Sequence, residues 1–539
     1  MASLPVAGGR RIAHNTGSLF LSRVVVAGAS LAALPVLYDG LGPRGFGVWA
    51  LLGVLVALVS LADLGLGTAQ IREVARAHDA AGCRRARAAL GLGMLCSVGL
   101  GLLALLGTLV CWPVLARLFH VGDLAHEARD GALWLMLGVL LDQISLPWRS
   151  MLAGTQRYTA IAWTTAATAL LGAVFAVLVV RLGGGLAALG ASTAVTSAIR
   201  AAVLMTTAHR GIGWLTPRVR GIRRADVRAA ARYGLPVQVT RATGVVNSEL
   251  GRLVVGGSFG PAQVAGFDLG SRLLSVLRLP PDLLFTVLFP FAVSGVARHG
   301  RDWLDNFYLT TTRYVVAFAG PCAAALVVCA DPLIRCWIGQ PVPWAAATVA
   351  ILAPSYALGL TAGAATLVTR VEGRPDRETW YLLLALALNL ALVPPLLRLC
   401  GPLGAALSTA IAITVSSGYF AVWFHRATGR PLVGLLRAIR PGVVAAFVAG
   451  VGGGLAAPYL PEFAGRTGAG LTVLCRGGAV LLIAAVVLVA TGLVGGAERT
   501  WLTALWRRWA QYGRSLLTRQ PAAPVGGGVP DATIRKDVP

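Results

Sequence analysis

The chain has 539 residues, of which 56% are hydrophobic and only 13% are charged, and its mean hydropathy is +0.72. This composition excludes an ordinary soluble protein and indicates a protein that crosses a membrane many times. The net charge of +25 would favour nucleic acid in a soluble protein. Here the arginines gather in alternate loops, as the positive-inside rule requires. We therefore expect both termini in the cytoplasm, anionic lipid as a partner and no nucleic acid.

A helix needs about 20 apolar residues to cross the hydrocarbon core. About fourteen runs of this kind occur, which predicts an all-α polytopic membrane protein. Their approximate ranges are 17–38, 46–67, 89–116, 131–153, 159–181, 186–208, 234–257, 264–294, 306–332, 344–368, 379–399, 402–424, 441–460 and 470–494.

The first two runs lie in Gly17–Arg76 and are joined by the turn at Gly42-Pro43. Arg23 lies inside the first run and Asp63 near the end of the second. A basic loop follows them. This order of arginine, Gly-Pro turn, aspartate and basic loop is distinctive enough to look for elsewhere in the chain.

The same order returns 218 residues later, with Arg241, Gly260-Pro261 and then Asp282. Residues 181–193 and 398–409 also resemble each other at almost the same offset. We interpret this as two tandem repeats of six helices each. Because six is even, both repeats enter the membrane from the same side and are parallel, with a central cavity between them near the midplane.

The repeat predicts how the chain divides. The predicted parts are a cytoplasmic N-terminus (1–16), an N-lobe (17–208), a basic cytoplasmic linker (209–232), a C-lobe (233–426), an extra helix hairpin (427–496) and a tail that is first amphipathic and then disordered (497–539).

Arg23 and Arg241 occupy equivalent places about two turns into their helices, roughly 10 Å deep. A charge inside the membrane is costly, so such residues face a cavity or pair with each other. Guanidinium groups bind phosphate through two parallel hydrogen bonds and keep their charge. The two arginines could therefore bind a phosphate in the cavity, or each could pair with the carboxylate of the next helix, Asp63 or Asp282.

Other charges lie deeper in the predicted spans. Arg272, Arg278 and Asp282 share one run, and the last two are four residues apart, so they could bind a ligand or pair on one helix face. Asp142 and Glu249 are mid-span carboxylates. They could couple transport to a cation or open a gate, or they could make structural hydrogen bonds.

Motifs for catalysis are missing from the sequence. It contains no phosphate-binding P-loop, no HExxH zinc motif and no GxSxG nucleophile motif. We therefore predict that the protein is not an enzyme and that it uses no cofactor and no metal.

Several stretches resemble the oligosaccharide flippases of bacterial polysaccharide export, in the multidrug/oligosaccharidyl-lipid/polysaccharide exporter superfamily. The resemblance spans roughly residues 15–425 and is most specific at the start. The matching stretches are Ser18–Arg23, Leu41–Pro43, Phe46–Trp49, Ala62–Gly67, Gly154–Arg157 and Arg252–Gly256. The hairpin at 441–494 is similar to the two extra helices of lipid II flippases, although the opening stretch resembles that branch less.

The resemblance implies a flippase that moves undecaprenyl-diphosphate-linked oligosaccharide from the inner to the outer leaflet by alternating access. It implies export of exopolysaccharide, capsule or O-antigen across the bacterial inner membrane, with arginines on the diphosphate and a polymerase or export complex as a candidate partner. Three alternatives stay open at this point: a lipid II flippase, a cation-coupled multidrug exporter that uses Asp142 or Glu249, and a scaffold of a polysaccharide synthase complex.

Overall fold

A computed structural model describes residues 6–63, 65–77, 79–212, 215–219, 222–374 and 376–493. Internal contacts divide the chain into Met1–Val487 and Leu488–Pro539. The predicted amphipathic tail, 497–539, lies outside the described residues. Everything below concerns the first unit. The last turn of the final helix, from Leu488, belongs to the second unit.

The described residues form helices and short turns. The helices are α1 (Val6–Val59), η1 (Ser60–Asp63), α2 (Leu66–Ala75), α3 (Ala80–Leu118), η2 (Gly122–Leu124), α4 (Ala125–Gly154), α5 (Tyr158–Arg181), α6 (Leu186–Ile212), α7 (Arg224–Phe259), α8 (Pro261–His299), α9 (Arg301–Val328), α10 (Ala330–Ile338), α11 (Pro343–Val371), α12 (Asp376–Cys400), α13 (Leu403–Thr428), α14 (Leu432–Ala456), η3 (Ala457–Tyr459) and α15 (Gly465–Ala490).

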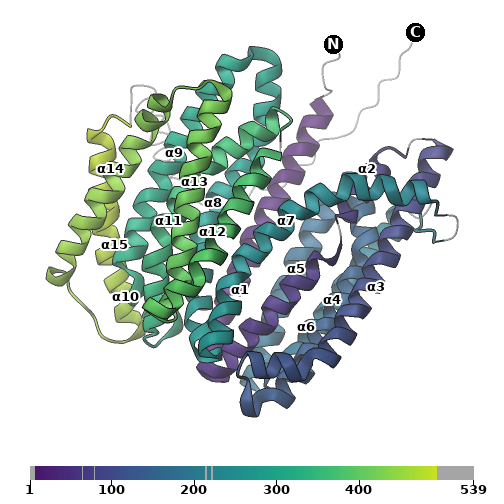
Figure 1. The fold of residues 1–539 in the computed structure, drawn as a ribbon, viewed down its shortest axis with the longest axis horizontal. Helices are drawn as coiled ribbons and strands as arrows, with labels where there is room; N and C mark the ends of the chain where they lie inside the picture. The colour runs from purple at the N-terminus through teal and green to yellow at the C-terminus, as the bar shows by residue number, and fades with distance from the viewer. Residues whose placement is uncertain are drawn as a thin grey trace, which may run out of the picture. The chain divides into compact units, whose positions relative to one another are not determined.

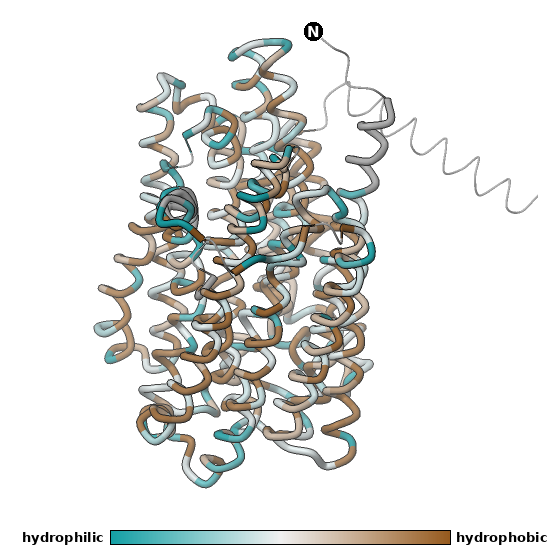
Figure 2. The backbone as a smooth tube through the Cα atoms, turned by 90° about the vertical axis from the view of Figure 1, so that its right-hand side faces the viewer, coloured by the Kyte–Doolittle hydropathy of each residue, from teal (hydrophilic) through white to brown (hydrophobic). Residues whose placement is uncertain are grey.

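Among these described residues, twelve helices are long and apolar enough to cross a membrane. The first, Gly17–Val59, is two helices joined at a kink. The long helix α7 adds one more segment, so each predicted run corresponds to a helix. Figure 2 shows hydrophobic residues along much of the helices and hydrophilic residues at the connecting loops. The predicted all-α membrane fold is confirmed.

The two Gly-Pro turns have the same backbone conformation. Gly42, inside α1, has φ 67° and ψ 171°, and Gly260, between α7 and α8, has φ 83° and ψ 175°. This region of the backbone map is essentially restricted to glycine. Proline follows both times at the start of the next helix, where its missing N–H costs nothing. One turn therefore serves the same purpose in both halves of the chain.

Equivalent helices pack on each other in the two halves. In the first half, α1 packs on α5, α3 on α4, and α6 on both α4 and α5. In the second half, α7 packs on α12, α9 on α11, and α13 on both α11 and α12. The added helix α14 packs on α9, and Figure 1 places α14 and α15 at the side of the second half away from the first.

The two halves meet through α1, α7 and α8. Helix α7 reaches across to α2 and α3 as well as to its own half (Figure 1). A side chain at Gly47 would overlap the carbonyl oxygen of Pro261, and one at Gly65 would overlap that of Gly234. Gln238 donates a hydrogen bond to the carbonyl oxygen of Leu61. Close backbone contact therefore joins the halves at Gly47, near the start of the second part of α1, and at Gly65, beyond the end of that helix.

Two helices extend past the predicted boundaries. Helix α1 begins at Val6, within the predicted N-terminal tail, and α7 begins at Arg224, within the predicted linker. The lobe boundaries themselves stay a prediction.

Candidate functional site

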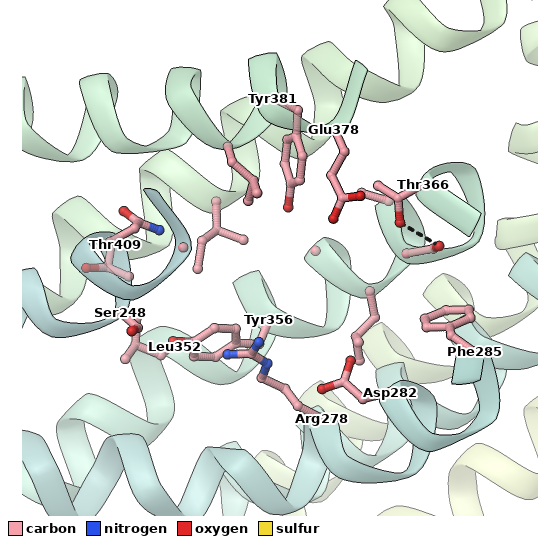
Figure 3. Close-up of a pocket in the computed structure, with 18 of the residues that line it drawn as sticks. Ser248, Arg278, Asp282, Phe285, Leu352, Tyr356, Thr366, Glu378, Tyr381 and Thr409 are labelled. Atoms are coloured by element: carbon pink, nitrogen blue, oxygen red, sulfur yellow. Dashed lines mark hydrogen bonds between the residues drawn. The ribbon is translucent and has the colours of Figure 1, made fainter. Parts of the chain in front are cut away.

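A pocket of about 640 Å³ opens among five helices of the second half, α7, α8, α11, α12 and α13. Figure 3 shows charged, aromatic and hydroxyl side chains around it. Of the eight predicted site residues, Arg278, Asp282 and Glu249 line this pocket. The other five lie outside the lining.

Arg278 and Asp282 lie one turn apart on α8, so helical spacing places them on one face. The Arg278 guanidinium lies 5.2 Å from the ring centre of Tyr356. Figure 3 shows the Asp282 carboxylate directed into the pocket. Asp282 interacts electrostatically with Arg278 and also with Arg23, which comes from α1 of the other half. Arg278 and Asp282 therefore lie together on the pocket wall, and the charge of Arg23 acts on Asp282 from the other half.

The other charged groups of the lining form ion pairs. Arg370 on α11 donates two hydrogen bonds, of 2.8 and 2.6 Å, to the Glu378 carboxylate on α12. Glu249 pairs with Arg252, three residues further along α7. Each pair cancels its own charge, which is how ionisable groups are normally accommodated inside a membrane protein.

Asp268 on α8 is a buried carboxylate that contacts two arginines, one of which, Arg252, lines the pocket. Its side chain is fully buried and lies 2.7 Å from Arg252 Nε and 2.6 Å from Arg272 Nε. Arg272, predicted to bind substrate, is thus engaged by Asp268. Sequence reasoning missed Asp268, although an aspartate four residues before Arg272 in an apolar run was the available signal.

Asp142 lies on α4, in the first half. It accepts hydrogen bonds from Arg200 Nε at 2.8 Å and from Ser197 at 3.1 Å, both on α6. Asp63 ends η1, and its side chain lies outside the described side chains. Arg241 lies on α7, three residues before Gly244, where the pocket lining begins on that helix.

A polar cluster supports the pocket on its α7–α12–α13 side. Asn389 is fully buried. Its amide nitrogen donates to Asn247 at 3.0 Å and to Thr409 at 3.3 Å, and its oxygen accepts from Ser408 at 2.9 Å. Asn247 and Thr409 also line the pocket. In the described part of the chain, no three His, Cys, Asp or Glu side chains are grouped so that they could hold a metal ion.

A family model described as "Polysaccharide biosynthesis protein" matches residues 12–295, which is more than half of the chain. The chain belongs to this family. The match begins in α1 and ends in α8, so it includes both Gly-Pro turns and the Arg278–Asp282 stretch. No curated protein matches the sequence.

Solved structures share the fold at low identity. The lipid II flippase MurJ in an inward closed conformation is 13% identical, with a TM-score of 0.66, and the match covers 89% of this chain and 98% of MurJ. An inward-facing multidrug resistance MATE family transporter is 14% identical, with a TM-score of 0.63 and coverages of 76% and 98%. A MOP superfamily transporter from Pyrococcus furiosus is 15% identical, with a TM-score of 0.56 and coverages of 78% and 95%.

The family and the fold agree. This polysaccharide biosynthesis family member is a multi-pass membrane protein with the fold of MOP superfamily flippases and transporters. The family predicted from the opening stretch is confirmed.

Proposed function

We propose that the protein is a flippase for undecaprenyl-diphosphate-linked oligosaccharide in the bacterial inner membrane, with both termini in the cytoplasm. It moves the glycan from the inner to the outer leaflet by alternating access, for exopolysaccharide, capsule or O-antigen export. The observation that carries this proposal is the pair Arg278 and Asp282 in the pocket lining, with Arg23 of the other half close enough for its charge to act on Asp282. Among the described residues, Arg278 has no carboxylate within ion-pair distance and is available to a ligand.

A diphosphate substrate requires a positively charged group such as the Arg278 guanidinium on its path. A diphosphate cannot cross hydrocarbon unpaired, because the desolvation cost of its charge is prohibitive. Arg23 and Arg278 come from opposite halves and can bind it from two sides. Asp282 interacts with both arginines when no ligand is bound. A bound diphosphate would replace Asp282 as the partner of these arginines. A ligand shifts a conformational equilibrium only if its contacts differ between the conformations, and this exchange would supply such a difference.

Arg241 extends the same binding surface. It precedes Gly244 by three residues and Ser248 by seven, and this helical spacing supports a position next to the pocket lining on α7. We assign it to the diphosphate as well. Arg272 acts indirectly: its bond to Asp268 fixes the pocket-lining part of α8.

A lipid II flippase is the second candidate, because the likeness to MurJ covers more of this chain than the likeness to the MATE transporter does. A cation-coupled exporter has less support. Asp142 and Glu249, the carboxylates it would use, already pair with Arg200 and Arg252.

The test is translocation in proteoliposomes. Undecaprenyl-diphosphate oligosaccharide is loaded in one leaflet, and its appearance in the other is followed with an added glycosidase. Hydrogen bonds to charged groups contribute about 1.5–3 kcal/mol each. We therefore expect Arg23→Ala/Arg278→Ala to slow translocation by about tenfold or more. Arg335→Ala, which removes an exposed arginine paired with Asp331, should have no effect.

Two outcomes of this test would contradict different parts of the proposal. Unchanged translocation in the double variant would contradict the assignment of the arginines. No translocation by the wild type, with several glycans and an imposed ion gradient, would contradict the flippase.

A further inference from the structure

The charges that line the pocket balance. Three arginines and three carboxylates contribute to the lining: Arg252, Arg278, Arg370, Glu249, Asp282 and Glu378. Four of them are committed to two ion pairs. An anionic ligand inside the pocket would meet as many carboxylates as guanidinium groups. Juxtaposed like charges cost several kcal/mol, so this lining favours a ligand without net charge.

The groups directed into the pocket include both hydrogen-bond donors and hydrogen-bond acceptors. Figure 3 shows the Asp282 carboxylate, the Glu378 carboxylate and the Tyr381 hydroxyl directed into the space. Arg278 supplies N–H donors beside them. A ligand hydroxyl both donates and accepts, so adjacent hydroxyls can satisfy a carboxylate and a guanidinium together. An apolar cation would satisfy only the acceptors.

Aromatic rings form the rest of the binding surface. Two tyrosines and three phenylalanines line the pocket: Tyr356, Tyr381, Phe267, Phe285 and Phe289. The Tyr381 ring is held by Phe420, with the ring centres 5.1 Å apart. Apolar walls with a few placed polar groups, in a volume of about 300–1,000 Å³, are typical of sites for small organic ligands.

We infer that the pocket in the second half binds uncharged, hydroxyl-rich sugar units of the lipid-linked glycan, while the diphosphate lies at its edge beside Arg23 and Arg241. This inference rests on the proposed function and adds a substrate class to it. The sugar and phosphate sites adjoin at Arg278: the balanced lining beyond it favours the neutral sugar, and Arg23 of the other half supplies the extra positive charge for the phosphates. Glycans that begin with a uronic acid are disfavoured.

The experiment compares three probes on the full-length protein in nanodiscs: undecaprenyl diphosphate, the same lipid carrying a neutral disaccharide, and the same lipid carrying a disaccharide with a uronic acid. We expect the neutral disaccharide to strengthen binding by about tenfold or more over the sugar-free lipid, which corresponds to one or two net hydrogen bonds. The uronic acid should bring no such gain.

Two variants sharpen the comparison. Asp282→Asn removes one negative charge from the lining, so the preference should shift towards the uronic acid probe. Tyr381→Ala should lower the ratio of neutral-sugar to sugar-free affinity. Tyr419→Ala, on the exposed surface of α13 and outside the pocket lining, is the matched control and should keep the wild-type ratio. Because each result is a ratio within one variant, a general loss of folded protein cannot imitate it.

The inference is overturned if the uronic acid probe binds as tightly as the neutral one, or if Asp282→Asn leaves the preference unchanged. Equal binding of all three probes also overturns it while leaving the diphosphate site intact. Failure of the sugar-free lipid to bind would instead count against the proposed function.

Discussion

At the scale of single residues, Asp268 is a buried charge that we expect to stabilise the fold. It is fully buried and lies against both Arg252 and Arg272. Removing its carboxylate leaves Arg272 without a carboxylate partner among the described residues and leaves Arg252 with Glu249 alone, and breaking a buried ion pair costs about 3–5 kcal/mol. We expect Asp268→Asn to lower the apparent melting temperature in detergent clearly. Asp331→Asn, which breaks an exposed pair with Arg335, should change it little. Equal effects of the two changes would contradict this account.

Asp142 gives a second residue-scale prediction. Its bonds to Arg200 and Ser197 tie α4 to α6. We expect Asp142→Asn to cost about 1 kcal/mol of stability, because the pair is partly exposed, and to leave the dependence of transport on an ion gradient unchanged. Transport rates measured with and without a proton or sodium gradient would test this. A lost gradient response would restore the coupling role that the sequence left open.

At the scale of elements, the two Gly-Pro turns carry the repeat. Gly42 and Gly260 have positive φ with ψ near 180°, where a side chain costs about 1–3 kcal/mol. We expect Gly42→Ala and Gly260→Ala each to destabilise the protein by that amount in thermal unfolding. Gly28→Ala is the control, since that helical position in α1 has open space around it and alanine favours the helix. A Gly42→Ala variant as stable as Gly28→Ala would contradict the assigned conformation.

At the scale of the whole molecule, the halves meet where backbone touches backbone. A side chain at Gly47 would overlap the carbonyl oxygen of Pro261. We expect Gly47→Val to push the halves apart at that end and to shift the population towards conformations open there. Distances between spin labels on the two halves would report the shift. Gly53→Val, in the same helix with nothing nearby, should leave the distances as in the wild type.

The helices and the repeat could be predicted from the sequence, because the length of a hydrophobic run and the position of a Gly-Pro turn are local properties. The ion-pair partners of the charged residues could not be predicted, because they depend on how distant helices pack. Arg23 was expected to face Asp63 or a phosphate, and the sequence did not suggest that its charge would also act on Asp282 of the other half. Helix α7 brings Arg252 to Asp268, and α12 brings Glu378 to Arg370. No spacing along the sequence predicts those pairs.

The most direct measurement of the central claim is a side-by-side rate in wild-type proteoliposomes. One arm follows undecaprenyl-diphosphate-linked neutral oligosaccharide from one leaflet to the other, and the other arm follows efflux of a cationic dye under a proton gradient. The account predicts translocation of the lipid-linked glycan well above that of protein-free vesicles, with no dye efflux. Dye efflux together with a glycan rate equal to protein-free vesicles would contradict it.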